Sequence, residues 1–436
     1  MLERLSASSH PPRRRRKARN LQPARHSLNE ILQQNAGTPL FVRPVCWTDT
    51  HTRLLGASFV ELPACDTPRP GNVPGSPPSR GHLRPSQAIT TLSETLTEIL
   101  MPDALHPILT SNAVRTIMSM LWPAAFDRAQ LLPEFHIFFG DRVYRDAVRT
   151  QVMWNYPADG VRSSQVSFSS ISTRSVDSSV ASTPTPSPHN PANLPMMCYI
   201  GKNQLASMRK NLFRVPFGPE RGWNAPVVRL QRLRARCLVP DNTDYDAHFV
   251  AIFLVMAQRH FYGAPRPSPR RDSLWSCGNG RPERPAFEDI KLRILTHDNE
   301  TAEFIVYTAV ITARFLDRFH EPACAPSHAD GMDDGAPGMQ IEFTRVPIWP
   351  ILGLRERLGK ALGEEVVGQF DASVMETWEE SDAEGRQRKD SKRRREALSE
   401  VLNGSFEEDT GSDEQCSPLN VKRRRLAEGS PVGVVA

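Results

Sequence analysis

Three carboxylates around a predicted β-hairpin are the first candidates for chemistry. Asp289, Asp298 and Glu303 resemble the acidic set with which nucleases hold catalytic metal ions. Such nucleases usually have a lysine two positions after the glutamate, which polarises the scissile phosphate, and this chain has Ile305 there. The residues 297–299 also read as a turn, because Asp and Asn tolerate turn conformations of the backbone. A divergent nucleic-acid-processing enzyme is therefore an alternative interpretation, and we assign no catalytic residue.

A metal site is a weaker candidate. The residues His320, Cys324 and His328 follow one another at intervals of four positions, which is not a familiar spacing for zinc ligands. Two prolines in the same stretch mark a loop. The chain also contains no phosphate-binding loop, no nucleophile elbow and no zinc-protease motif. We therefore expect neither a metal nor a cofactor.

Basic residues form the candidate binding surface. Arg232, Arg234 and Arg236 alternate with apolar residues, which predicts a half-buried strand carrying all three arginines on one face. Lys291 and Arg293 alternate in the same way on a second predicted strand. Together they predict a surface for a phosphate backbone or an acidic peptide. The alternative is an edge strand that its charges protect from aggregation.

The C-terminal tail carries two blocks of four cations separated by an acidic stretch. Blocks of this kind in a flexible tail are typical of nuclear import signals. We therefore expect a nuclear import receptor as a partner and the nucleus as the location. An Arg/Ser-rich start also fits a mitochondrial transit peptide, although prolines interrupt the helix that such a peptide needs. The blocks are Lys392, Arg393, Arg394 and Arg395, and Lys422, Arg423, Arg424 and Arg425.

Two serines are candidate phosphorylation sites. Ser268 precedes a proline and two arginines, and Ser405 lies shortly before two glutamates. Proline-directed and acidic-directed kinases, respectively, act on such sequences. A phosphate group beside a basic block would mask its positive charge.

Composition points to one folded core within a longer chain. Of 436 residues, 38 are proline, and only 39% are hydrophobic, so much of the chain lacks the apolar surface that offsets the entropy of ordering. The seven cysteines form no C-x-x-C pair, which suits a reducing compartment. The longest apolar run covers 250–257, far short of the ~20 residues that a membrane span needs. We expect no membrane partner.

The expected organisation has seven segments, with disordered tails at both ends. They are a basic tail over 1–38, docking strands over 39–63, a Pro/Gly linker over 64–85, a helical or mixed segment over 86–157, a Ser/Thr/Pro-rich disordered insert over 158–195, a core over 196–375 and a charged tail over 376–436.

The expected elements define an α+β fold with a single core of helices and antiparallel strands. Apolar periodicity predicts helices within 86–126, and a helix over 245–261 that is apolar on every side and must therefore be buried. Alternation predicts a hairpin with strands at 290–294 and 304–307. Helical spacing is expected for 310–319, a last strand near 341–343 and a final helix over 354–367.

Two stretches of this core resemble an uncharacterised protein group of filamentous fungi. They are Ala257-Gln258-Arg259-His260-Phe261-Tyr262-Gly263 and Lys291-Leu292-Arg293-Ile294-Leu295-Thr296-His297-Asp298-Asn299. The resemblance covers about residues 198–375 and implies no activity and no catalytic residue.

These patterns favour a non-enzymatic nuclear interaction or regulatory protein. Its expected partner is another nuclear protein docked on the core, or chromatin-associated nucleic acid reached through the basic arms. The protein partner is preferred because the core contains no recognisable nucleic-acid-binding module.

Overall fold

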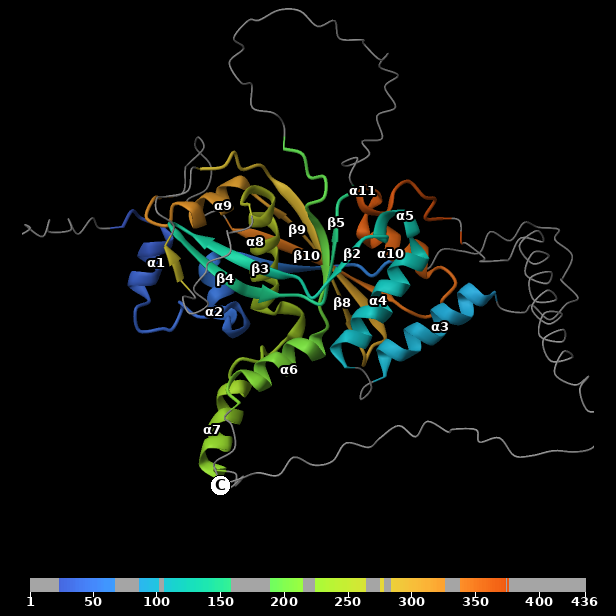
Figure 1. Ribbon diagram of the computed structural model, residues 1–436, viewed down its shortest axis with the longest axis horizontal. Coiled ribbons are helices and arrows are strands. Elements are labelled where there is room, and N and C mark those ends of the chain that lie inside the picture. Colours follow the sequence, from blue (N-terminus) through green and yellow to red (C-terminus); the bar gives the residue numbers. More distant parts are fainter. Residues whose placement is uncertain are drawn as a thin grey trace, which may run out of the picture. The chain divides into compact units, whose positions relative to one another are not determined.

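The computed structural model describes residues 23–66, 86–101, 106–157, 189–214, 224–263, 275–277, 284–325, 338–373 and 375 of the chain. The C-terminal tail, most of the Ser/Thr/Pro-rich insert and the first 22 residues lie outside this set. The described residues have an α+β fold, as expected, with a mixed sheet and helices (Figure 1). Within these residues, no helix has the length and apolar character required to cross a membrane.

A seven-stranded sheet runs through the described structure in the order β1-β10-β9-β8-β6-β5-β2. The predicted hairpin is confirmed as β8 and β9, which pair antiparallel from Ile290 to Asp298. The sheet is not purely antiparallel, because β1 pairs parallel with β10 and β6 pairs parallel with β8. Its strands are β1 (Ala57–Leu62), β2 (Ala129–Leu131), β5 (Val152–Asn155), β6 (Pro195–Tyr199), β8 (Ile290–Asp298), β9 (Glu303–Ile311) and β10 (Met339–Pro347).

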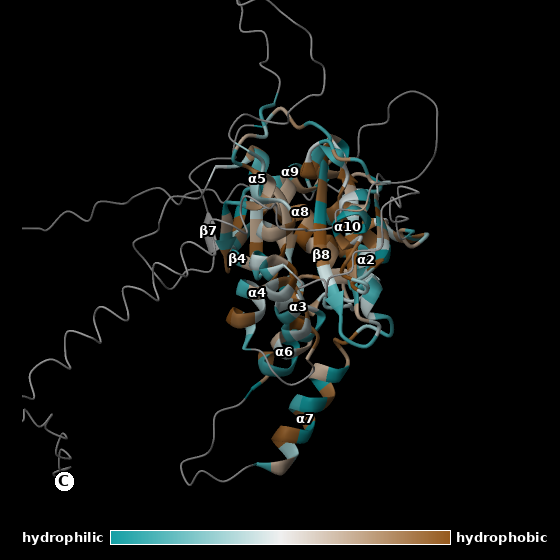
Figure 2. Ribbon diagram, turned by 90° about the vertical axis from the view of Figure 1, so that its right-hand side faces the viewer, coloured by the Kyte–Doolittle hydropathy of each residue, from teal (hydrophilic) through white to brown (hydrophobic). Residues whose placement is uncertain are grey.

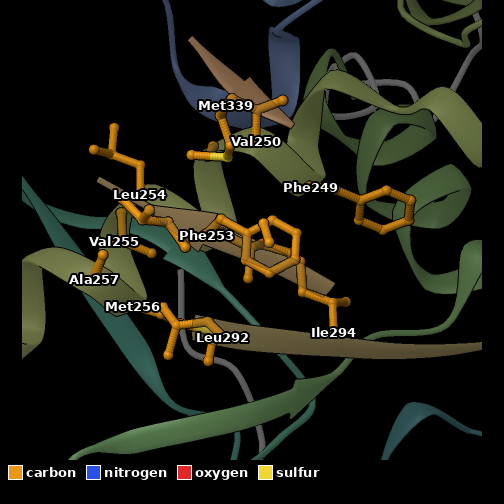
Figure 3. Packing of buried hydrophobic residues seen from close by; sticks show 14 of the residues in the cluster. Phe249, Val250, Phe253, Leu254, Val255, Met256, Ala257, Leu292, Ile294 and Met339 are labelled. Carbon is orange, nitrogen blue, oxygen red and sulfur yellow. The ribbon is translucent and has the colours of Figure 1, made fainter. Parts of the chain in front are cut away.

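One face of the sheet packs against α8 (Ala247–Phe261), the helix predicted to be apolar all round. A second sheet of β3 (Glu134–Phe139), β4 (Arg142–Arg149) and β7 (Trp275–Cys277) has β3 and β4 in contact with the other side of α8. Because α8 lies between two sheets, its apolar residues are buried on every side. Figure 3 shows its side chains among those of Leu292, Ile294 and Met339 from the large sheet.

The other face of the large sheet packs against helices from two separate parts of the sequence, residues 87–126 and 354–367. The apolar cluster on this face contains residues of the segment 86–157 together with residues of the predicted core up to Val366. Two strands of that segment, β2 and β5, belong to the same sheet. Residues 86–157 are therefore built into the core. The predicted final helix is two helices separated by Gly363. The helices of this face are α3 (Gln87–Leu100), α4 (Pro107–Leu121), α5 (Pro123–Phe126), α10 (Leu354–Leu362) and α11 (Glu364–Val367).

Short elements near the N-terminus pack around α8. The hydroxyl of Ser27 caps α1 (Leu28–Gln34) by accepting a hydrogen bond from the Glu30 amide. The prediction of strands over 39–63 is wrong for all but β1. The 3₁₀ helix η1 (Pro44–Cys46) and α2 (Asp49–Leu55) come first, and Gly56, with a φ of 73°, ends α2 and starts β1.

A second correction concerns residues 310–319. Val310 and Ile311 belong to β9, and the helix α9 (Ala313–His320) begins after Thr312, whose side chain caps it. The apolar residues of this stretch fit helical spacing although the first two belong to a strand, because β9 and α9 follow each other without a break in the apolar pattern.

Candidate interaction surface

The helix α7 (Ala225–Arg236) carries the three arginines that were predicted to lie on a strand. The strand prediction is wrong because Leu, Arg, Ala and Gln favour helix and Asn224 provides a cap, its side chain accepting from the Val227 amide at 3.4 Å. Pro226 in the first turn also suits a helix start. At about 100° per residue, Arg234 therefore points away from Arg232 and Arg236.

The arginines of α7 have a different arrangement from the one predicted. Arg229, Arg232 and Arg236 fall within about 60° of one another around the helix axis, from 3.6 residues per turn, and form an exposed basic ridge. Beside this ridge lie Leu230 and Leu233, which are 49% and 60% exposed. In Figure 2, α7 carries apolar and polar residues together and lies apart from the sheets. The basic ridge and the two leucines define the candidate interaction surface.

Only α6 (Lys202–Leu212) packs appreciably against α7 among the described elements. The single buried residue of α7 is Ala235, on the side opposite Leu230 and Leu233. The leucines therefore point away from the side by which α7 contacts its own chain. Both Figure 1 and Figure 2 show α7 extending beyond α6.

The helix α6 is tied to the core at its first turn by charge. Lys202 Nζ lies 2.6 Å from Asp244 Oδ1 and 2.8 Å from Asp298 Oδ2. Arg345 of β10 pairs with Asp244 as well and with Glu303 of β9. Burial raises the pKa of Asp298, but the hydrogen bond and the charge of Lys202 lower it, and the net shift of the pKa is downward. This network holds the first turn of α6 at the ends of β8 and β9, where Asp298 and Glu303 pair across the strands.

A buried polar junction fixes the chain just before α6. Gln151 Oε1 accepts from the Gly201 amide at 2.7 Å, and the Tyr199 hydroxyl lies 2.9 Å from His297 Nδ1. Burial lowers the pKa of His297 to about 4 and raises that of Tyr199. His297 is thus neutral at pH 7. Because its ring also donates to the Ile99 backbone carbonyl, its Nδ1 is left to accept a hydrogen bond from the Tyr199 hydroxyl. Both side chains are closed off from solvent, which fits support of α6 rather than catalysis.

The predicted basic surface also included Lys291 and Arg293 of β8, and only one of the two is exposed. Lys291 is exposed, but Arg293 is only 1% exposed and pairs with Glu365 of α11. Lys291 Nζ lies 2.6 Å from the same carboxylate. Because α11 lies over this face of β8, Arg293 is not available to the binding surface that the sequence predicted.

The three carboxylates of the nuclease hypothesis do not converge. Asp298 and Glu303 are cross-strand partners, whereas Asp289 precedes the other end of β8, about 30 Å away at ~3.3 Å per residue. Asp289 instead accepts a hydrogen bond from the Ala313 amide at the start of α9. The constellation is absent from the described structure, and no group of three acidic, histidine or cysteine side chains there is arranged to hold a metal ion.

Of the three candidate zinc ligands, the structure describes His320 and Cys324. His320 is buried and its Nδ1 lies 2.8 Å from the Tyr262 hydroxyl, while Cys324 is exposed. His328 lies outside the described residues. The candidate phosphorylation sites Ser268 and Ser405 lie outside them too, as do both import blocks, 392–395 and 422–425.

Leu230 and Leu233 were missed by the sequence reasoning. Their spacing of three and the capping signal Asn224-x-Pro226 together indicate an amphipathic helix. The alternation of arginine with apolar residues over 232–237 obscured that signal. That the leucines face solvent depends on which side of the helix its own chain covers, and the sequence does not contain this information.

Comparison with known proteins adds no relative to this description. No family model matches the chain, and no curated protein is similar to it.

Proposed function

We propose that this chain is a non-enzymatic interaction protein of the nucleus, and that it engages its partner through α7. The observation that carries the proposal is the exposure of Leu230 and Leu233 beside three arginines on a helix held away from the core. Apolar side chains grouped on an exposed surface and rimmed by charge mark interaction sites. The import blocks supply the nuclear part of the proposal.

The rest of the described structure supports a binding role for the projecting helix. The core is a scaffold: α8 fills the space between two sheets, and α6 is bound to the core by buried and half-buried ion pairs. A rigid base that presents one exposed helix reduces the entropy lost when a partner binds. The protein partner is favoured over nucleic acid, because phosphate contacts would leave the leucines without a role.

The test compares variants of the full-length chain in affinity capture from nuclear extract, with and without nuclease. Leu230→Asp/Leu233→Asp should remove the specific partners, while Arg115→Glu/Arg128→Glu, at exposed positions in α4 and just after α5, should keep them. Partners that survive nuclease and disappear with the leucine variant support the proposal. Partners that are the same in both variants contradict it. Partners that vanish with nuclease instead favour chromatin-associated nucleic acid as the target.

A further inference from the structure

The exposed leucines of α7 have the spacing of a coiled-coil seam. Leu230 and Leu233 lie in α7, and Cys237 is its C-cap residue with helical backbone angles. They are separated by three and then four residues, which corresponds to positions a, d and a of a heptad. All three are exposed. Residues at these positions form the apolar line along which a second helix packs.

The residues that flank this seam are all cationic on its exposed part. Arg229 and Arg236 occupy the g positions, and Arg234 occupies the following e position. Residues at e and g face those of the opposite helix and decide which partner is accepted. Ala235, the buried residue, occupies f, diametrically opposite the seam. The side by which α7 rests on its own chain therefore leaves the seam and both of its flanks open.

We propose that the partner of α7 is an acidic amphipathic helix of another protein, an inference that rests on the proposed function. That helix presents apolar residues at a and d, packed on Leu230 and Leu233, and Asp or Glu at e and g, paired with Arg229, Arg234 and Arg236. Arg234, which the strand interpretation placed on one face with Arg232 and Arg236 and which the helix turns away from them, here has a role on the second flank of the seam.

Two other occupants fit the charges less well. A second copy of α7 would place arginine against arginine on both flanks, and like charges at these positions repel. A nucleic acid would pair with the basic ridge of Arg229, Arg232 and Arg236, but it would leave Leu230 and Leu233 exposed and unused. Only an acidic helix satisfies the seam and its flanks together.

The experiment measures binding of side-chain-stapled helical peptides to the full-length chain by fluorescence anisotropy. Circular dichroism first establishes that each peptide is helical. One peptide has Leu at a and d and Glu at e and g over about three heptads, the length from which heptad pairing is recognisable. A second has Lys at e and g, and a third has the composition of the first with its heptad order scrambled. A double-stranded DNA of similar length is the fourth probe.

We expect the Glu heptad peptide to bind and the Lys and scrambled peptides not to bind. Arg229→Glu/Arg234→Glu/Arg236→Glu should weaken the Glu peptide at least about tenfold, for three ion pairs of ordinary exposed strength, and should create binding to the Lys peptide. Leu230→Ala/Leu233→Ala should abolish binding without unfolding, since both side chains are exposed. Arg115→Glu/Arg128→Glu is the matched control and should bind like the unchanged protein.

Several outcomes would overturn the inference. Equal binding of the scrambled peptide would reduce the surface to nonspecific charge, and binding of DNA alone with the same arginine dependence would make it a phosphate surface. Self-association that disappears in Leu230→Ala/Leu233→Ala would assign the seam to a second copy. If α7 variants lose their nuclear partners but no acidic peptide binds, the proposed function stands and only the acidic-helix inference fails.

Discussion

Arg209 of α6 and Asp246 at the start of α8 form a bidentate ion pair in the interior, with both nitrogen–oxygen distances 2.6 Å. Asp246 also caps α8 by accepting from the His248 amide at 2.9 Å. The third guanidinium nitrogen of Arg209, Nε, donates to the Val45 carbonyl at 3.2 Å. With its partners satisfied, this pair fixes α6 to the core and so supports the helix that carries the candidate interaction surface.

The first prediction concerns this pair. Arg209→Met or Asp246→Ser alone should lower the free energy of unfolding by about 3–5 kcal/mol, because each leaves a buried charge without its partner. The double variant should lose less than the sum of the single losses. Urea denaturation of the full-length chain measures all three. As a control, Glu134→Gln breaks an exposed pair with Arg149 and should cost at most about 1 kcal/mol. Strict additivity of the two interior replacements would show that they do not act as a pair.

The second prediction concerns pH and the buried junction before α6. Burial lowers the pKa of His297 from 6.5 to about 4 in the folded state, so the unfolded chain binds more protons between these values. The contribution of His297 to the free energy of unfolding is therefore fully present above pH 6.5. It is lost as the pH falls toward 4, by up to about 1.4 kcal/mol per pH unit. His297→Gln keeps an acceptor for the Tyr199 hydroxyl and should flatten this slope. Urea midpoints at pH 7.5 and 5 measure it; equal slopes in both proteins would mean that His297 is not held neutral.

The third prediction concerns the Ser/Thr/Pro-rich insert. Its last residues belong to the described fold, since the Tyr156 amide donates to the Leu194 carbonyl at 2.9 Å and the Asn193 amide donates to the Tyr156 carbonyl at 3.1 Å. Replacing 160–186 with a short Gly/Ser linker should leave the melting temperature unchanged. Replacing 160–194 removes both hydrogen bonds and should cost about 1 kcal/mol or more for each. Equal melting temperatures for the two deletions would show that residues 189–194 do not contribute to stability.

The fourth prediction concerns location. Replacing Lys422 to Arg425 with alanine should reduce nuclear accumulation of a fluorescent fusion, because the import receptor reads dense positive charge. Replacing Lys392 to Arg395 as well should reduce it further. Arg128→Ala, a single exposed cation on the core, should have no effect. An unchanged distribution of the variant that lacks both blocks would refute nuclear import by these residues.

The sequence alone determined the elements whose patterns are unambiguous. The run Phe249 to Ala257 is apolar at every position, so the only stable place for such a helix is between two layers, and α8 lies there. The hairpin of β8 and β9 followed from alternation on both sides of a turn sequence. Ser27 and Ser86 cap α1 and α3, and such starts are encoded in the local sequence because a cap is a local interaction.

Only the tertiary structure decided what depends on neighbours distant in sequence. Arg293 and Lys291 look alike in sequence, but α11 covers one and leaves the other exposed. The helix over Arg232 to Arg236, by contrast, follows from local signals, namely the cap at Asn224 and the helix-forming residues, and only the exposure of its side chains depends on the tertiary structure. Burial is set by what packs against a residue. The exposure of Leu230 and Leu233 therefore follows from the tertiary structure, in which α6 contacts α7 and Ala235, on the opposite side of the helix, is its buried residue.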